Sequence, residues 1–348
     1  MRILITGNMG YVGSVLTSHL RSNHPAAELI GFDAGYFSHC LTGKGPIPEV
    51  ALDRQHFGDV RNLSPALLEG VDAVVHLAAI SNDPMGNRFE AATHAINYEA
   101  SVDVARKAAA AGVASFVFAS SCSVYGFAAD GRARAEEDAL NPLTAYARSK
   151  IATEDALKQA ELSGMRVRCL RFATACGMSP RLRLDLVLND FVASALALGE
   201  IKVLSDGAPW RPLIDVSDMA LAMDWAVTAS DNAGRFVTLN VGSDGWNWQV
   251  RDLAEAVARA VPGARVSINT QAPPDKRSYR VDFRAFAALA PEHQPRMSLD
   301  GAIERLRRGL QEIAFADGDF RNSDLMRLRV LEDLVQSKAL RPDLMPAR

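Results

Sequence analysis

The first twenty-one residues carry the pattern that most restricts the fold of this chain. Residues 2–6 form a short apolar run with β-branched side chains, which is typical of a buried parallel strand. Gly7, Gly10 and Gly13 follow at once, and apolar residues then recur at helical spacing up to Arg21. A strand, a glycine turn and a helix in immediate succession predict the first unit of a parallel α/β sheet.

The same glycines predict a site for a dinucleotide. In such a turn Gly7 permits the tight bend, Gly10 lets a diphosphate approach the backbone, and Gly13 lets the helix pack closely on the strand. The free N–H groups at the helix start then face the diphosphate charge. A second apolar run, residues 28–32, ends in Asp33, which stands 20 positions after Gly13. A carboxylate there accepts hydrogen bonds from ribose hydroxyls and repels a 2′-phosphate, so the sequence favours NAD over NADP.

Further strands and helices alternate along the first half of the chain. Residues 71–79 form a strand that runs into small residues, and residues 115–121 form another that ends in hydroxyl side chains. Between them lies an alanine-rich helix over about 93–111, closed by Gly112 as its C-cap. This alternation predicts an α/β fold, a Rossmann-type doubly wound parallel sheet with its ligand across the carboxyl ends of the strands.

A tyrosine and a lysine stand four positions apart in the segment 146–150. On a helix, Tyr146 and Lys150 leave the same face. An ammonium ~4 Å from the phenol oxygen would favour the phenolate by roughly 4 kcal/mol, or about 3 pKa units, at an effective dielectric of 20. The spacing therefore predicts a tyrosine whose pKa is lowered toward the range of efficient acid–base catalysis.

Taken together, these segments resemble the extended short-chain dehydrogenase/reductase family, and within it the NAD-dependent nucleotide-sugar epimerases and dehydratases of the UDP-glucose 4-epimerase type. The resemblance spans residue 1 to about residue 300. The matching segments are Thr6-Gly-x-x-Gly-x-x-Gly13, His76-Leu-Ala-Ala79, Ser120-Ser-Cys-Ser-Val-Tyr-Gly126, Tyr146-x-x-Ser-Lys150 and Leu170-Arg171-Phe172.

The resemblance implies a role for individual residues. Tyr146 would be the catalytic acid or base, Lys150 its partner and a ribose ligand, and Ser121 the hydroxyl that holds the sugar oxygen. The implied cofactor-binding residues are Gly7, Gly10, Tyr11, Val12, Gly13, Asp33, Asp59, Val60, Leu77, Ala78, Ala79 and Lys150. The implied substrate-binding residues are Ser121, Tyr146, Thr174, Asn189, Arg211 and Asp275.

The substrate residues follow from segments of the second half. Arg211 matches the arginine that binds the nucleotide diphosphate, since a guanidinium can meet phosphate oxygens in a bidentate way. Asn189 is a second candidate for that diphosphate, and Asp275 fits the aspartate at the base or ribose. Thr174 replaces the asparagine that usually touches the substrate diphosphate, which puts that contact in doubt.

One departure from the family bears on the reaction. Where 4,6-dehydratases of this group place an acid-bearing pair after the catalytic threonine, this chain has Cys122 and Ser123. Neither is a strong acid, so a standard elimination is disfavoured, although an unusual one that uses the Cys122 thiol stays open. The sequence therefore predicts 4-epimerisation of a nucleotide sugar through a 4-keto intermediate. The alternatives are a 4-dehydrogenase or ketoreductase, an atypical dehydratase, and a non-catalytic NAD-binding regulator.

The same reading divides the chain into three parts. We expect an NAD-binding domain over residues 1–177, to which later strands near 213–241 return, and a substrate-binding lobe mainly over 178–316. Residues 317–348 would form a helical tail that packs on the body or on a partner.

Bulk properties limit the partners. A net charge of −3 with scattered signs argues against a nucleic-acid surface, and no apolar run approaches the ~18 residues of a membrane span. The strand at residue 2 leaves no room for a signal peptide, and the four cysteines lack metal-ligand or disulfide spacing. We therefore expect a cytoplasmic protein without a metal. The family suggests a homodimer through the helices near 97–111 and 146–161.

Overall fold

The computed structural model of the protein describes residues 1–43, 45–128, 130–162, 164–229, 234–272 and 277–347. Its centre is a seven-stranded sheet in the order β11-β7-β5-β4-β1-β2-β3, in which all neighbouring strands are parallel. Its strands are β1 (Arg2–Thr6), β2 (Glu28–Asp33), β3 (Arg54–Phe57), β4 (Ala73–His76), β5 (Ser115–Ser121), β7 (Arg166–Phe172) and β11 (Phe236–Val241). The predicted Rossmann-type α/β class is confirmed.

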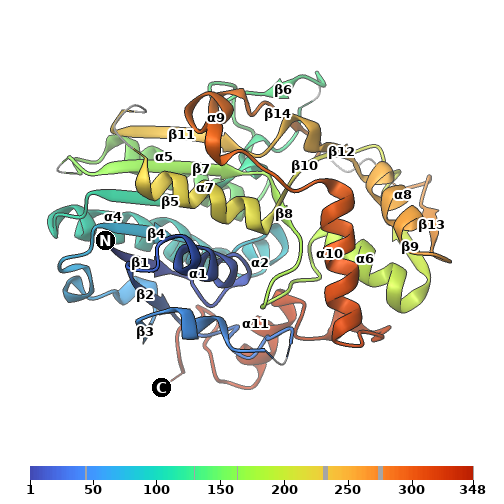
Figure 1. Ribbon diagram of the computed structural model, residues 1–348, viewed down its shortest axis with the longest axis horizontal. Helices are drawn as coiled ribbons and strands as arrows, with labels where there is room; N and C mark the ends of the chain where they lie inside the picture. The colour runs from blue at the N-terminus through green and yellow to red at the C-terminus, as the bar shows by residue number, and fades with distance from the viewer. Residues whose placement is uncertain (44, 129, 163, 230–233, 273–276, 348) are drawn as a thin grey trace.

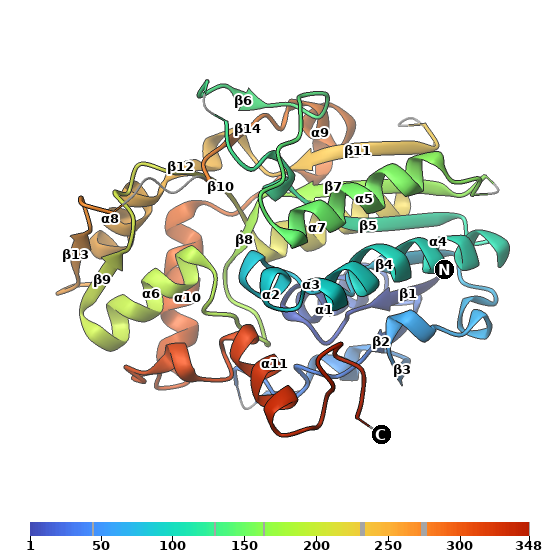
Figure 2. The same cartoon turned by 180° about the vertical axis from the view of Figure 1, so that it is seen from behind.

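Helices cover both faces of this sheet. The α-helices of the described residues, including those that lie beside the sheet, are α1 (Tyr11–Asn23), α2 (Asp83–Arg88), α3 (Glu90–Thr93), α4 (Ser101–Ala110), α5 (Ala145–Gln159), α6 (Val187–Leu198), α7 (Val216–Thr228), α8 (Val250–Ala260), α9 (Arg284–Leu289), α10 (Leu299–Glu312) and α11 (Arg327–Gln336). Figure 1 shows α1 and α7 on one face, and Figure 2 shows α3, α4 and α5 on the other. The alternation of β1 explains the two cores: Ile3 and Ile5 join the core under α1 and α7, whereas Leu4 joins the opposite one.

The predicted helix over residues 93–111 is interrupted by a π-helical segment, His94–Ala100. It contains Asn97, whose amide accepts from the backbone N–H of Ile80 at 2.8 Å and donates to the Ile80 carbonyl at 3.0 Å. Both backbone groups of Ile80 are thereby fixed, so this segment anchors the loop that follows β4. The helix ends as predicted at Gly112, which has a φ of +81°.

A smaller lobe stands beside the sheet. Its elements α6, α8 and α10 enclose a third core around Leu188, Leu253 and Leu306. The remaining strands form small sheets outside the central one, and they are β6 (Ala133–Arg134), β8 (Thr174–Cys176), β9 (Glu200–Val203), β10 (Trp210–Asp215), β12 (Asn247–Gln249), β13 (Arg265–Ile268) and β14 (Arg280–Val281). β11 joins the central sheet beside β7, whereas β10 pairs with β8 and β12.

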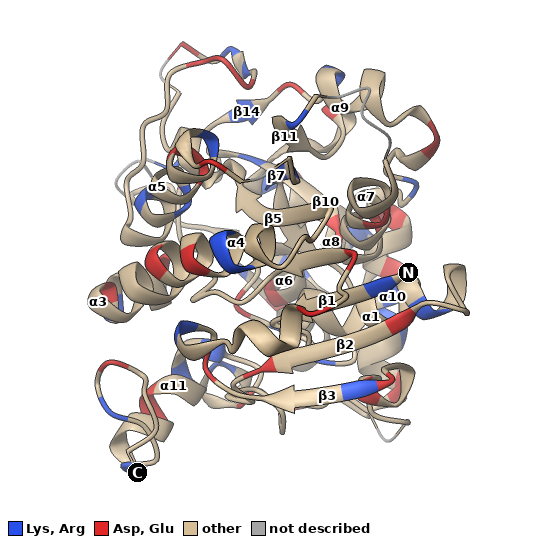
Figure 3. Cartoon of the chain, turned by 90° about the vertical axis from the view of Figure 1, so that its left-hand side faces the viewer, with Lys and Arg blue, Asp and Glu red and all other residues tan. Residues whose placement is uncertain are grey.

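The last thirty residues return to the body of the molecule. α11 lies near α2, and the chain after it runs beside β2 and β3 (Figure 2). Leu331, Leu340 and Leu344 are buried in the core that also contains Phe32 and Val60. In Figure 3, acidic and basic residues are interspersed over the elements that face the viewer. Among the described residues, no helix is long and apolar enough to cross a membrane.

Candidate active site

A cavity of about 1070 Å³ runs along the carboxyl ends of β1, β2, β4 and β5 and reaches toward the lobe. This volume lies at the upper end of the ~300–1,000 Å³ range of ligand pockets, as expected for a site that binds a large ligand. The residues of the sequence analysis that line it are Gly7, Gly10, Tyr11, Val12, Gly13, Asp33, Asp59, Val60, Leu77, Ala78, Ala79, Ser121, Tyr146, Lys150, Thr174 and Arg211.

The glycine turn forms one end of the cavity. A Cβ on Gly7 would lie 2.6 Å from the backbone nitrogen of Ala78, and one on Gly13 would lie 2.4 Å from the Gly7 carbonyl oxygen. A Cβ on Gly10 would meet only that same carbonyl oxygen, at 3.2 Å. Gly10 is the N-cap of α1, and no side chain in the described part of the chain caps this helix. Its first N–H groups are therefore available to an anion, as a dinucleotide diphosphate requires.

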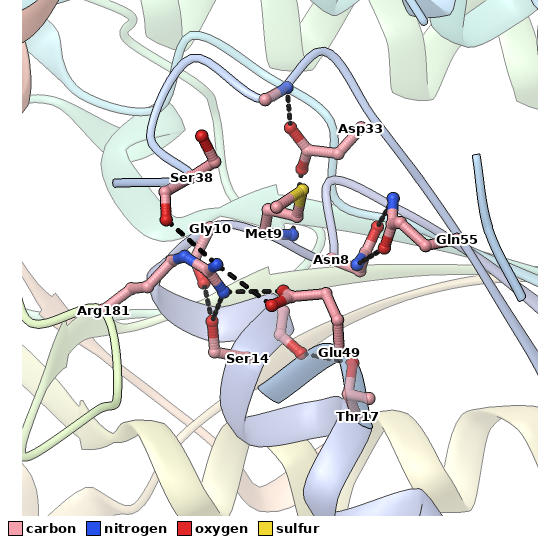
Figure 4. A network of polar contacts seen from close by, with 12 residues as sticks. Asn8, Met9, Gly10, Ser14, Thr17, Asp33, Ser38, Glu49, Gln55 and Arg181 are labelled. Carbon is pink, nitrogen blue, oxygen red and sulfur yellow. Dashed lines mark hydrogen bonds and ion pairs between the residues drawn. The ribbon is translucent and has the colours of Figure 1, made fainter. Parts of the chain in front are cut away.

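Asp33 is held rigidly beside this turn. Its carboxylate accepts from the backbone N–H of Met9 at 2.9 Å and from that of Gly35 at 2.8 Å (Figure 4). Burial raises the pKa of the Asp33 carboxyl above its usual range, and the two amide hydrogen bonds work against that shift. Each carboxylate oxygen keeps a further lone pair for a ribose hydroxyl. The turn and this acid together fit NAD.

A threonine side chain positions the reaction end of the cavity. The Thr144 hydroxyl caps α5 by accepting from the Ala147 N–H at 3.1 Å, so Tyr146 and Lys150 lie on the first two turns. The Lys150 ammonium donates to the Ala119 carbonyl at 2.6 Å, which ties α5 to the end of β5. It lies 5.7 Å from the centre of the Tyr146 ring and 4.6 Å from that of Phe118.

The predicted lowering of the tyrosine pKa is wrong for the protein in this state. Burial raises the pKa of Tyr146 to about 12, which the hydrogen bond with Ser121 opposes and the charge of Asp83 reinforces. Burial also lowers the pKa of Lys150 to about 8. The prediction considered the attraction between the two groups and omitted the desolvation of the phenol, which is the larger effect here.

Ser121 lies at the end of β5, close to the Tyr146 hydroxyl. Its Oγ accepts from the Ser123 N–H at 3.1 Å and so caps the 3-10 turn Cys122–Tyr125. Ser123 also lines the cavity, and its hydroxyl is buried without a hydrogen-bond partner among the described residues. The structure thus brings Ser121 and Tyr146 together.

Cys122 points away from this site. It is fully buried, its thiol donates to the Arg171 carbonyl at 3.1 Å, and burial raises its pKa well above the usual range. It is absent from the described residues that line the cavity. A role of the thiol as an acid therefore finds no geometric support.

The predicted substrate residues meet different outcomes. Thr174 at the start of β8 and Arg211 on β10 both line the cavity. Asn189 is absent from its described lining: its amide accepts from the Gly177 N–H at 2.9 Å and donates to the Arg183 carbonyl at 2.9 Å. Because the side-chain amide of Asn189 is already hydrogen-bonded to backbone groups, we do not assign Asn189 to the substrate. Asp275 lies outside the described residues.

Several residues that line the cavity were not predicted from the sequence. Asp83 on α2 accepts from the Thr144 hydroxyl at 2.7 Å, and Arg183 makes a two-pronged ion pair with Asp185 at 2.9 Å. Arg327 of the tail also lines the cavity. Two arginines in the segment 180–186 were the available signal for Arg183, whereas Asp83 and Arg327 lie in no recognisable motif.

Comparison with known proteins identifies the family. Residues 3–242 match the family described as "NAD dependent epimerase/dehydratase family". The chain belongs to this family. Its members are NAD-dependent nucleotide-sugar epimerases, dehydratases and decarboxylases of the short-chain dehydrogenase/reductase type, and the cofactor is NAD.

Individual relatives carry different activities. The chain is 31% identical over 227 residues to the uncharacterized UDP-glucose epimerase YtcB of Bacillus subtilis, covering 63% of this chain and 70% of YtcB. It is 26% identical over 323 residues to a dTDP-glucose 4,6-dehydratase of an Actinoplanes strain, covering 87% of this chain and 96% of that enzyme. The solved structure of MoeE5 in complex with UDP-glucuronic acid and NAD is 25% identical and superposes with a TM-score of 0.75, covering 89% of this chain and 99% of MoeE5.

Proposed function

We propose that this enzyme epimerises a nucleotide sugar at C4 through a 4-keto intermediate, with Tyr146 as acid and base. The observation that carries the proposal is the convergence of the Ser121 and Tyr146 hydroxyls on one point of the cavity, where the strong acids of a 4,6-dehydratase are replaced by a buried thiol and a serine.

The roles of the side chains follow from this geometry. When bound, NAD supplies the hydride acceptor and donor. Tyr146 takes up the proton of the C4 hydroxyl during oxidation and returns it during reduction, and Ser121 hydrogen-bonds the same oxygen. Because burial raises the Tyr146 pKa, the phenolate needs positive charge nearby. Arg183 lowers that pKa, and Lys150 adds a second cation on the same helix as the tyrosine.

The diphosphate of the substrate would lie toward the lobe. Arg211 and Thr174 come from the paired strands β10 and β8, so the two side chains are fixed relative to each other. We propose these residues as its ligands and Asp275 as a ligand of the base or ribose. The cofactor residues of the sequence analysis that line the cavity are proposed for NAD.

The test is an incubation of the pure protein with a panel of nucleotide sugars. We expect a C4-epimerised product with no net gain in the absorbance of reduced nicotinamide. Accumulation of reduced nicotinamide in step with a ketosugar would contradict epimerisation and favour the 4-dehydrogenase alternative. Tyr146→Phe serves as the control that ties turnover to this site.

One observation favours a second function, an atypical dehydration. Asp83 faces the cavity close enough to Tyr146 to raise its pKa, and it holds the Thr144 hydroxyl at 2.7 Å. Asp83 could therefore take the place of the acid that positions 122 and 123 lack. A product lighter by one water, lost in Asp83→Asn but not in Cys122→Ala, would establish this reaction in place of epimerisation.

Further expectations remain proposals. We propose that the chain divides into an NAD-binding part over residues 1–177, a lobe mainly over 178–316 and the tail. We also propose a cytoplasmic homodimer that pairs through α4 and α5. Light scattering of the pure protein tests the dimer, since a monomer at micromolar concentration would contradict it.

A further inference from the structure

The tail forms part of the wall at the cofactor end of the cavity. The Tyr36 hydroxyl, which follows β2, donates to the Leu344 carbonyl, and the Arg61 guanidinium donates to the Asp343 carbonyl at 2.8 Å. Tyr36, Met326 and Arg327 all line the cavity. The tail is thus bonded to the loops at the ends of β2 and β3, where the adenosine half of a dinucleotide lies in this fold.

Arg327 is a buried charged residue of the tail. Its side chain is 1% exposed. One guanidinium nitrogen donates to the carbonyls of Arg181 and Leu182 at 2.9 and 3.0 Å, and the other donates to the Asp324 carbonyl at 2.6 Å. The guanidinium carbon lies 5.2 Å from the centre of the Phe37 ring, which also lines the cavity.

The charges around Arg327 do not balance. Three buried arginines gather here, and two of them have carboxylate partners: Arg181 pairs with Glu49 at 2.7 Å and Arg183 with Asp185 at 2.9 Å. No carboxylate of the described residues lies within 4.0 Å of Arg327, which meets only carbonyl oxygens and a ring. Burial lowers its pKa to about 10, so it stays charged at neutral pH. A buried cation with no anion in contact is costly, because its lost hydration is only partly replaced.

The segment that Arg327 contacts also contacts the start of α1. The Arg181 guanidinium donates to the Ser14 hydroxyl at 3.2 Å, and the Ser179 hydroxyl donates to the Tyr11 carbonyl at 2.7 Å (Figure 4 shows the Arg181 contacts). The segment 179–183 therefore lies against the first turn of α1, whose uncapped N–H groups face a diphosphate. Arg327 holds the carbonyls of this same segment from the tail side.

We propose that Arg327 is a ligand of the NAD diphosphate, contributed by the tail at the edge of the glycine turn. The diphosphate would neutralise the buried Arg327 guanidinium. In return, the guanidinium would give the diphosphate a charged hydrogen-bond donor besides the helix N-terminus. The proposal rests on the cofactor of the family and is independent of the sugar reaction.

The test compares three variants in binding experiments on the full chain freed of cofactor. Arg327→Gln removes the charge but keeps an amide donor. Arg327→Lys keeps the charge but lacks the paired N–H donors of a guanidinium, and Arg329→Gln is the control. Arg329 lies exposed on the same helix and pairs with Asp333 at 3.3 Å. The probes are NAD, ADP-ribose, adenosine and UDP, measured by titration calorimetry.

We expect Arg327→Gln to raise the Kd of NAD and ADP-ribose by roughly tenfold to a hundredfold, as for the loss of a charged hydrogen bond. The Kd of adenosine should change less than about twofold, since adenosine carries no phosphate, and Arg329→Gln should leave all values unchanged. Arg327→Lys should fall between the parent and Arg327→Gln.

Three results would overturn the proposal. Unchanged NAD and ADP-ribose binding would exclude the contact. An equal loss for adenosine would show that Arg327 only shapes the wall, and a loss for UDP with intact NAD binding would assign the cation to the other diphosphate. If Arg327→Gln does not fold, as judged by circular dichroism, the comparison of NAD with adenosine in Arg327→Lys decides by the same criteria.

Discussion

The two ends of the cavity are built in different ways. The reaction end comes from neighbouring pieces of chain: Ser121 ends β5, Tyr146 and Lys150 begin α5, and α2 packs on Tyr146, so that a Cβ on Gly86 would lie 2.9 Å from the Tyr146 Cβ. The cofactor end joins the glycine turn to the segment 179–183 and to the tail. Short motifs therefore mark the reaction end and the glycine turn, whereas only the tertiary fold brings the segment 179–183 and the tail to the cofactor end.

The largest effect should come from the tyrosine of the reaction end. Tyr146→Phe removes the proton carrier, and we expect turnover to fall by about 10²–10⁴-fold. NAD binding by titration should change little, because the glycine turn and Asp33 are untouched. A variant that turned over substrate as fast as the parent would contradict the catalytic assignment.

The second prediction concerns a substitution that disturbs only the cofactor end. Gly13→Ala places a Cβ 2.4 Å from the Gly7 carbonyl oxygen, in a turn whose backbone has no room to move. We expect NAD binding to weaken by at least about a hundredfold, because a shift of this turn spoils the cradle.

Its matched control is Gly112→Ala, far from the cavity. Gly112 has a φ of +81°, but a Cβ there would meet no atom within 4 Å. It should cost about 1 kcal/mol of unfolding free energy through backbone strain and leave NAD binding intact. Equal losses of NAD binding in both variants would refute a specific role of the turn.

The third prediction concerns His76, which lies beneath both ends at the end of β4. Its ring bonds the Thr6 and Ser101 hydroxyls, each at 2.9 Å, and burial lowers its pKa to about 3. Below pH 6.5 the unfolded chain binds a proton that the folded chain does not. The contribution of neutral His76 to the free energy of unfolding is therefore complete above pH 6.5 and is lost as the pH falls toward 3. At pH 4.5 the loss amounts to about 3 kcal/mol.

Chemical denaturation of the parent and of His76→Gln at pH 7 and pH 4.5 measures this contribution. The parent should lose more unfolding free energy between the two pH values than the variant does. The same loss in both proteins would show that His76 is not the responsible group.

The smallest effect should follow Cys122→Ala. Among the described residues the thiol lies off the cavity lining and bonds only the Arg171 carbonyl, so we expect less than about a threefold change in turnover and a stability cost of about 1–2 kcal/mol. A collapse of turnover with normal folding would instead make the thiol part of the chemistry.

The contrast between the ends also explains what the sequence could predict. Residues 2–6 and 115–121 are the strands β1 and β5, because buried parallel strands have local apolar signatures. The four-residue spacing of Tyr146 and Lys150 fits a helix, and both residues lie on α5. The raised pKa of Tyr146 was not predictable, since it comes from burial by α2 and neighbouring segments.

Long-range partners account for the other differences. Asn189 is a residue type that can bind a diphosphate, but in the fold its side-chain amide is hydrogen-bonded to the backbone of Gly177 and Arg183. The sequence predicts a helical tail over residues 317–348 and gives no sign that Arg327 lies against the segment 179–183. Such contacts have no local pattern.

The route of the tail also bears on the order of synthesis. A ribosome releases the glycine turn and the reaction end long before residues 327–344, which complete the wall beside Tyr36 and Arg61. Domains generally fold from the N-terminus as they emerge. The nascent sheet can thus form early, but its cofactor cavity gains this part of its wall only when residues 327–344 have emerged. Capture of NAD should therefore follow the synthesis of this segment.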